Sequence, residues 1–115
     1  MPEERPWGTY EILLDTDYCK VKSIIVNTGE QLSYQYHNHR NEVWVIVKGD
    51  AQITLNNNIT NHYYGDIINI PKLTKHTVKN IGIEELIFIE TQYGESFNES
   101  DIIRLNDKYG RVDYE

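Results

Sequence analysis

The chain has 115 residues and a mass of 13.6 kDa. It contains 11 Lys and Arg residues and 18 Asp and Glu residues, which gives a formal net charge of −7 and a pI near 5.0. This length suffices for one core of modest size, so we expect a single domain over residues 1–115. The acidic balance argues against nucleic acid or an anionic membrane surface as a partner. No apolar run approaches the roughly 20 residues that span a bilayer.

The cellular setting follows from the N-terminus and the cysteine content. Residues 1–5 are charged and precede no apolar segment, so no secretory signal is expected. Cys19 is the one cysteine and cannot form an intramolecular disulfide, which fits a reducing compartment. We therefore expect a cytoplasmic protein. Small β-domains often cover exposed sheet edges by association, which favours a homodimer.

The hydrophobic pattern is strand-like along almost the whole chain and predicts an all-β fold. Segments rich in Val, Ile, Thr and Tyr predict strands over 18–26, 42–48, 50–55, 66–70 and 85–91. Turn residues separate them every roughly 8–15 residues, as in a sandwich or closed barrel. Hairpins are predicted at Gly49-Asp50 and at 56–58, where asparagine tolerates positive φ. The segment 99–108 predicts a short helix capped by Ser100.

Three of the four histidines fall into a pattern that suits metal binding. On a strand, His37 and His39 leave the same face because they are two residues apart. Glu42 has the opposite parity, so we expect a bend around 40–41 that turns its carboxylate to the same centre. An adjacent antiparallel strand would deliver His76. These four side chains would hold a divalent transition metal, with Zn, Mn, Co, Ni and Fe all compatible.

A plainer interpretation makes 37–39 a polar strand face and His76 a surface residue. The glycine and proline spacing around these residues favours the metal site. Six residues separate Glu42 from Gly49, and His76 follows Pro71 by five positions. These spacings resemble the two motifs of the cupin family. The resemblance implies a double-stranded β-helix, which is a jelly-roll barrel.

A closer resemblance covers nearly the whole chain. Residues 32–44 read Leu-Ser-Tyr-Gln-Tyr-His-Asn-His-Arg-Asn-Glu-Val-Trp, which resembles the signature of type II phosphomannose isomerases. Segments 5–10, 89–94 and 101–111 resemble the same family. The resemblance implies a metal-dependent isomerase of mannose 6-phosphate and fructose 6-phosphate that feeds GDP-mannose synthesis, with a small-molecule sugar phosphate as partner. In many relatives a sugar-nucleotide transferase domain precedes this one, and the resemblance of this chain does not imply a guanylyltransferase activity.

Aldose–ketose isomerisation moves a proton between C1 and C2 through an enediol, which needs a base and an electrophile. Glu90 is predicted to be the base, provided that its strand face points into the barrel. Gln35 shares a face with His37 and would orient a hydroxyl or a metal-bound water. Arg40 resembles the family's active-site arginine and is predicted to hold the phosphate, the alternative being an ion pair with Glu42. Secondary candidates for a phosphate contact are Lys20, Lys22, Lys72, Lys75 and Arg104.

The chain departs from the family pattern at three places. Val43 replaces a usual histidine, Leu73 replaces a turn glycine, and the segment 95–100 has a different sequence. Two alternatives to the isomerase therefore stay open. One is a non-catalytic or differently specific cupin that binds a sugar phosphate or another small polar metabolite. The other is a metal-dependent dioxygenase, which also needs histidine ligands and open metal positions.

Overall fold

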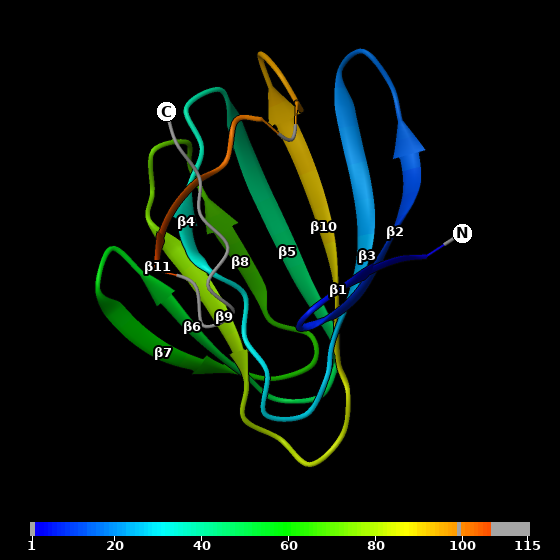
Figure 1. The fold of residues 1–115 in the computed structure, drawn as a ribbon, viewed down its shortest axis with the longest axis vertical. Coiled ribbons are helices and arrows are strands. Elements are labelled where there is room, and N and C mark those ends of the chain that lie inside the picture. The colour runs from blue at the N-terminus through cyan, green and yellow to red at the C-terminus, as the bar shows by residue number, and fades with distance from the viewer. Residues whose placement is uncertain (1, 99, 107–115) are drawn as a thin grey trace.

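A computed structural model describes residues 2–98 and 100–106, and within them it contains eleven β-strands and no helix (Figure 1). The all-β prediction is confirmed for this part of the chain. The strands are β1 (Glu3–Arg5), β2 (Gly8–Asp15), β3 (Cys19–Val26), β4 (Tyr34–Tyr36), β5 (Arg40–Lys48), β6 (Ala51–Leu55), β7 (Asn58–His62), β8 (Ile67–Ile70), β9 (His76–Asn80), β10 (Leu86–Gly94) and β11 (Ile103–Asn106).

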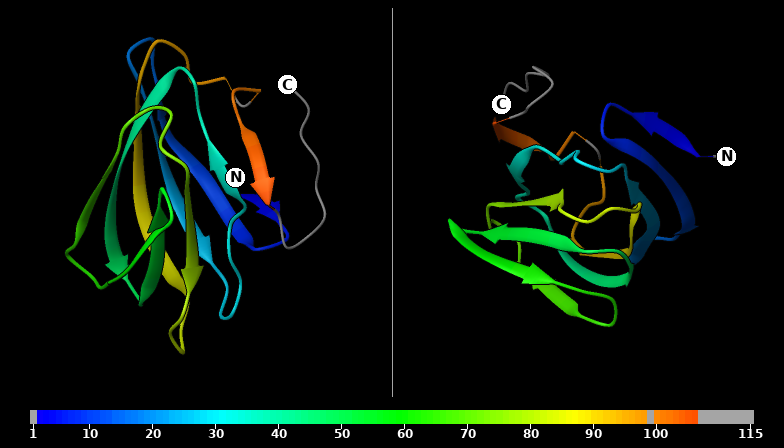
Figure 2. Two further views of the ribbon diagram at one scale, coloured as in Figure 1. Left: turned by 90° about the vertical axis from the view of Figure 1, so that its left-hand side faces the viewer. Right: turned by 90° about the horizontal axis from the view of Figure 1, so that it is seen from below.

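These strands form two sheets that curve around a common interior (Figure 2). The six-stranded sheet has the order β1-β2-β3-β10-β5-β8, and the five-stranded sheet has the order β11-β4-β9-β6-β7. The pairings between these strands are antiparallel. The architecture is the double-stranded β-helix that the cupin resemblance implies.

The two predicted hairpins have different outcomes. At 49–50 the chain crosses from β5 in one sheet to β6 in the other, so the predicted hairpin there is wrong. Gly49 has a φ of 87°, and a Cβ at this position would lie 2.8 Å from the carbonyl oxygen of Glu85, so the crossing requires glycine. The second hairpin is confirmed. β6 and β7 pair through a two-residue turn in which Asn56 and Asn57 have φ values of 47° and 71°.

The predicted helix over 99–108 is also wrong within the described residues. Residues 103–106 form β11, which pairs antiparallel with β4. A ten-residue segment has little helical stability of its own. Pairing with the exposed edge of β4 instead satisfies backbone groups of both strands. Tertiary context therefore overrides the local helix signal.

The interior is apolar at one end and polar at the other. On β10 the buried side chains run from Leu86 and Phe88 to Glu90 and Gln92. The register places Glu90 opposite Lys22 of β3, while Gln92 lies opposite a glutamate of β5. Polar side chains from three neighbouring strands therefore gather at the same end of the barrel. The apolar core is formed by Trp7, Ile24, Val26, Leu32, Trp44, Ile46, Ala51, Ile53, Ile68, Ile70, Val78, Leu86 and Phe88.

Leu73 adopts a backbone conformation that disfavours its own side chain. Its φ is 70°, in the left-handed region, and its side chain is exposed, so no packing compensates. We expect Leu73→Gly to raise the free energy of unfolding by about 0.5–1 kcal/mol, because relief of the left-handed cost exceeds the added unfolded-state entropy. Urea denaturation measures the change. Lys72→Gly, at a neighbouring position without positive φ, is the control and should lower stability; a similar decrease in Leu73→Gly would contradict the prediction.

Candidate metal centre and ligand pocket

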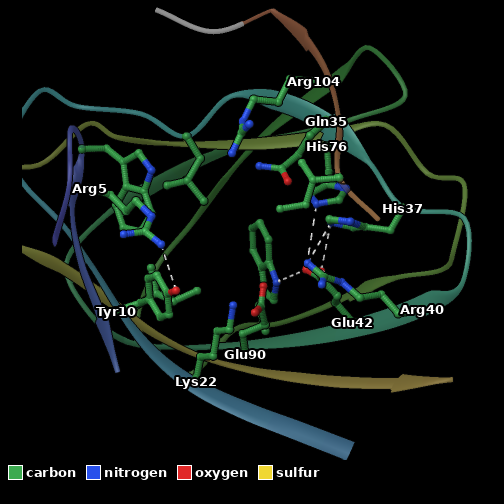
Figure 3. Close-up of a pocket in the computed structure, with 15 residues that line it drawn as sticks. Arg5, Tyr10, Lys22, Gln35, His37, Arg40, Glu42, His76, Glu90 and Arg104 are labelled. Atoms are coloured by element: carbon green, nitrogen blue, oxygen red, sulfur yellow. Dashed lines mark hydrogen bonds and ion pairs between the residues drawn. The ribbon is translucent and has the colours of Figure 1, made fainter. Parts of the chain in front are cut away.

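A pocket lies at the polar end of the interior, between the two sheets (Figure 3). Its walls come from strands that are far apart in the sequence, including β1 near the N-terminus and β11 near the end of the described chain. The lining residues are Arg5, Trp7, Tyr10, Lys22, Ile24, Leu32, Gln35, His37, Arg40, Glu42, Trp44, His76, Glu90, Ile102 and Arg104.

Three potential metal ligands meet in this pocket. His37 follows β4, Glu42 lies on β5, and His76 begins β9. All three are buried, and one ligand atom from each lies within 4.8 Å of the others. Two imidazoles and a carboxylate suit a divalent transition metal with further coordination positions open to water or substrate. The two sheets must therefore come together before the site exists.

The hydrogen bonds of both histidines favour the tautomer that a metal ligand needs. His37 Nδ1 lies 2.8 Å from the carbonyl oxygen of Asp101, and His76 Nδ1 lies 2.9 Å from that of Thr74. A carbonyl only accepts, so each Nδ1 donates its proton there, and each Nε2 is directed toward Glu42, where a metal ion would be bound. The Nε2 atoms lie 3.1 Å and 3.9 Å from the two carboxylate oxygens of Glu42. Burial lowers the pKa of His76 and keeps that ring neutral at neutral pH.

The carboxylate of Glu42 is held in its charged form. Burial alone would raise its pKa, but the hydrogen bond with His37 and the positive charge of Arg40 outweigh that effect and hold the pKa well below its usual range. Trp44 Nε1 donates to Oε1 at 3.0 Å, and Arg40 Nε donates to Oε2 at 2.9 Å. The residues present therefore fit a divalent cation in both charge and donor chemistry.

His39 does not join this cluster, so its predicted role as a fourth ligand is wrong. Its side chain is 57% exposed, and its Nδ1 lies 3.6 Å from Glu95 Oε1 at the surface. The prediction assumed a regular strand through His37 and His39. In the structure β4 ends at Tyr36, and the segment 37–39 connects it to β5 in the other sheet.

The bend lies at 38–39 rather than at the predicted 40–41. The carboxylate of Asp101 holds it by accepting hydrogen bonds from the backbone N–H groups of Asn38 and His39, both at 2.9 Å. From Arg40 to Ile46 the buried positions of β5 alternate regularly. Glu42 therefore reaches the pocket by ordinary strand alternation, with no bulge beside it.

Arg40 is engaged with the metal-ligand side of the pocket. Its guanidinium is buried, and besides the bond to Glu42 its Nη2 lies 3.2 Å from His37 Nε2. This is the ion pair that the sequence left open as the alternative to phosphate binding. The geometry supports a positioning role for Arg40, and a contact with phosphate stays a prediction.

Glu90 faces the interior, as its proposed role as a base requires. Its carboxylate is buried in the pocket wall and accepts a hydrogen bond from Gln92 Nε2 at 2.7 Å. Burial, together with the negative charge of Glu42, raises the pKa of Glu90 to about 8. A carboxyl group with a pKa near neutrality can both accept and return a proton at physiological pH.

Gln35 also lines the pocket, on β4 between its register partners His76 and Arg104. Its Nε2 donates to Ser33 Oγ at 3.1 Å, which fixes the plane of the amide. The predicted position of Gln35 beside the metal ligands therefore agrees with the structure.

Sequence reasoning missed two supporting residues. Trp44 orients Glu42, and strand alternation was the available signal, because the two residues are two positions apart. Asp101 shapes the bend before β5 from more than 60 positions away, and no local signal marks such a contact.

The departures at Val43 and Leu73 lie outside the pocket lining. Val43 alternates with the buried Glu42 and Trp44, so the missing histidine removes no pocket group.

In the part of the chain that the structure describes, no helix is long and apolar enough to cross a membrane.

The sequence profile described as Mannose-6-phosphate isomerase C-terminal matches residues 3–107. A mannose-1-phosphate guanylyltransferase of Escherichia coli strain K12 is 41% identical over 108 residues, which are 94% of this chain and 23% of that protein. Mannose-1-phosphate guanylyltransferase ManC of Salmonella typhimurium is 40% identical over 108 residues, which are 94% of this chain and 22% of that protein. The chain thus spans less than a quarter of the length of these relatives.

The fold has close counterparts among solved structures. The capsular polysaccharide assembling protein CapF of Staphylococcus aureus superposes with a TM-score of 0.78 over 92% of this chain and 34% of that one, at 20% identity. At this identity the likeness concerns the fold alone.

Proposed function

This chain belongs to the family described as Mannose-6-phosphate isomerase C-terminal, and from that premise we propose that it interconverts mannose 6-phosphate and fructose 6-phosphate with a divalent metal held by His37, Glu42 and His76. The observation that carries the proposal is the presence of a buried two-histidine, one-carboxylate cluster and a buried carboxyl of raised pKa, Glu90, in one pocket. Aldose–ketose isomerisation needs both an electrophile and a base beside the same two carbons.

The isomerisation would use the metal as the electrophile and Glu90 as the base. When bound, the metal would polarise the substrate carbonyl and stabilise the negative charge that develops on its oxygen. Glu90 in its ionised form would take the proton from C2 of mannose 6-phosphate and return it to C1. The hydroxyl proton on O2 must also pass to O1, and the two transfers together complete the shift through an enediol. Its pKa near 8 suits a group that must accept a proton and release it again.

Arg40 would orient the metal ligands, and Gln35 would orient the substrate. Arg40 fixes one carboxylate oxygen of Glu42 and contacts His37, so it holds two proposed ligands in their relative places. Gln35 presents its amide to the pocket on the opposite sheet and would orient a substrate hydroxyl. Neither role requires these residues to move a proton.

Incubation of the metal-loaded chain with mannose 6-phosphate in D₂O tests the proposal. We expect fructose 6-phosphate to form and deuterium to enter at C1 or C2, because a carboxyl base exchanges its proton with solvent between removal and return. NMR follows both events, and chelator-treated protein is the control. Saturable binding without conversion would contradict the isomerase and favour the non-catalytic cupin. Oxygen consumption with the reduced-iron form would favour the dioxygenase.

A further inference from the structure

The pocket has a second wall that is built of cations. Figure 3 shows Arg5 and Lys22 on the side of the pocket away from His37, while Arg104 lies next to Gln35 and directs its side chain into the same pocket. The three cations come from β1, β3 and β11, which lie far apart in the sequence. The fold therefore gathers positive charge at a place where the sequence shows no cluster.

Tyr10 orders two of these cations. The Arg5 guanidinium carbon lies 4.9 Å and the Lys22 ammonium nitrogen 4.4 Å from the centre of the Tyr10 ring. Both distances are within the range of cation–π attraction. Arg5 Nη2 also donates to the Tyr10 hydroxyl at 3.0 Å. Lys22 is 5% exposed, so this ammonium group lies in the pocket wall rather than in bulk solvent.

The pocket lining contains more cationic than anionic side chains, whereas the whole chain is acidic. Four Lys and Arg side chains line it, Arg5, Lys22, Arg40 and Arg104, whereas the lining contains two carboxylates, Glu42 and Glu90. Glu42 accepts a hydrogen bond from Arg40. Glu90 lies opposite Lys22 in the strand register and interacts electrostatically with it. Among the described residues that line the pocket, cationic side chains therefore outnumber carboxylates, in a chain whose net charge is −7. Such a site attracts an anion despite the overall charge.

We propose that Arg5, Lys22 and Arg104 form the subsite for the phosphate group of the substrate. The inference rests on the proposed function for the identity of the substrate, but the anion subsite follows from the cationic wall itself. Guanidinium groups present paired N–H donors that match phosphate oxygens. A sugar phosphate would then lie across the pocket, with its carbonyl end toward His37, Glu42 and His76 and its phosphate on the opposite wall. This assignment also leaves Arg40 in place beside Glu42.

Titration of the metal-free full chain with inorganic phosphate tests the subsite separately from catalysis. We expect saturable binding that weakens about 10- to 150-fold in Arg5→Gln and in Arg104→Gln, because each variant loses a charge-assisted hydrogen bond. Arg104→Lys should recover part of the loss, since it keeps the charge but not the planar donors. Lys72→Gln removes one exposed positive charge outside the pocket and should stay within about twofold of wild type.

Unchanged phosphate affinity in both arginine variants, or an equal loss in Lys72→Gln, would overturn the subsite. The same variants in the isomerase assay separate the two proposals. Conversion with an unchanged KM in the arginine variants would leave the isomerase intact and remove the subsite. Arginine-dependent phosphate binding without any conversion would leave the subsite intact and remove the isomerase.

Discussion

His37→Ala and His76→Ala are each expected to weaken divalent-metal binding by about 100-fold or more, whereas His39→Ala should stay within about twofold of wild type. Each of the first two removes an Nε2 donor that faces Glu42, and the ligand cluster contains no further histidine or carboxylate among the residues that the structure describes. His39 lies at the surface beside Glu95. Competition against a chromogenic chelator measures the affinities, and circular dichroism verifies that each variant is folded.

The His39 variant tests whether the chain bends at 38–39, in addition to testing which histidines bind the metal. His39 belongs to the same His-x-His motif as His37, so a strand-based arrangement would make the two residues equivalent. A loss in His39→Ala as large as that in His37→Ala would contradict the bend at 38–39. Full metal content in both His37→Ala and His76→Ala would remove the proposed centre.

Glu90→Gln is expected to lower turnover of mannose 6-phosphate by about 10²- to 10⁴-fold while metal content stays unchanged. Glutamine keeps the shape of the side chain and an oxygen that can accept the bond from Gln92, but it has no titrating carboxyl. Deuterium incorporation from D₂O should fall in parallel with turnover. A variant that retains full exchange would show that another group carries the proton.

The raised pKa of Glu90 also predicts a pH dependence of stability in the metal-free protein. The pKa of Glu90 is about 8 in the folded state, against an ordinary value of 4.5 for an exposed glutamate. Between these values the folded state binds a proton that the unfolded state has released, so the Glu90 contribution is fully present below pH 4.5 and is lost as pH rises toward 8. The slope is about −1.4 kcal/mol per pH unit for one group.

The difference in unfolding free energy between Glu90→Gln and wild type isolates this contribution from other titrating groups. We expect the variant to gain stability relative to wild type as pH rises from about 5 to 8. Denaturant titrations at several pH values measure it. A difference that does not change with pH would show that the carboxyl ionises normally in the folded protein.

Much of the site could be predicted from strand alternation and motif spacing. Glu90 was predicted to line the barrel if its strand face pointed inward, and it does, because β10 alternates between buried and half-buried positions from Leu86 to Gln92. The turn at 56–58 was readable because asparagine adopts positive φ at low cost. In both cases the determining interaction is local in sequence.

The structure differs from the sequence predictions at places where contacts between distant segments determine the backbone conformation. The strand assumed through His37 and His39 is interrupted by bonds to Asp101, and the helix expected at 99–108 gives way, in its described part, to pairing of β11 with β4. The hairpin expected at Gly49 fails because β5 and β6 find partners in different sheets. None of these partners lies within the local window that a propensity argument uses.

The sequence by itself determined the all-β class, the family, and three of the four proposed metal ligands, because periodicity and motif spacing are properties of the chain alone. Only the tertiary structure decided that His39 faces solvent, that Arg40 bonds to Glu42, and that a cationic wall stands opposite the metal ligands. Those features depend on which strands become neighbours. Strand partnership is fixed by burial of the whole interior, which no single segment encodes.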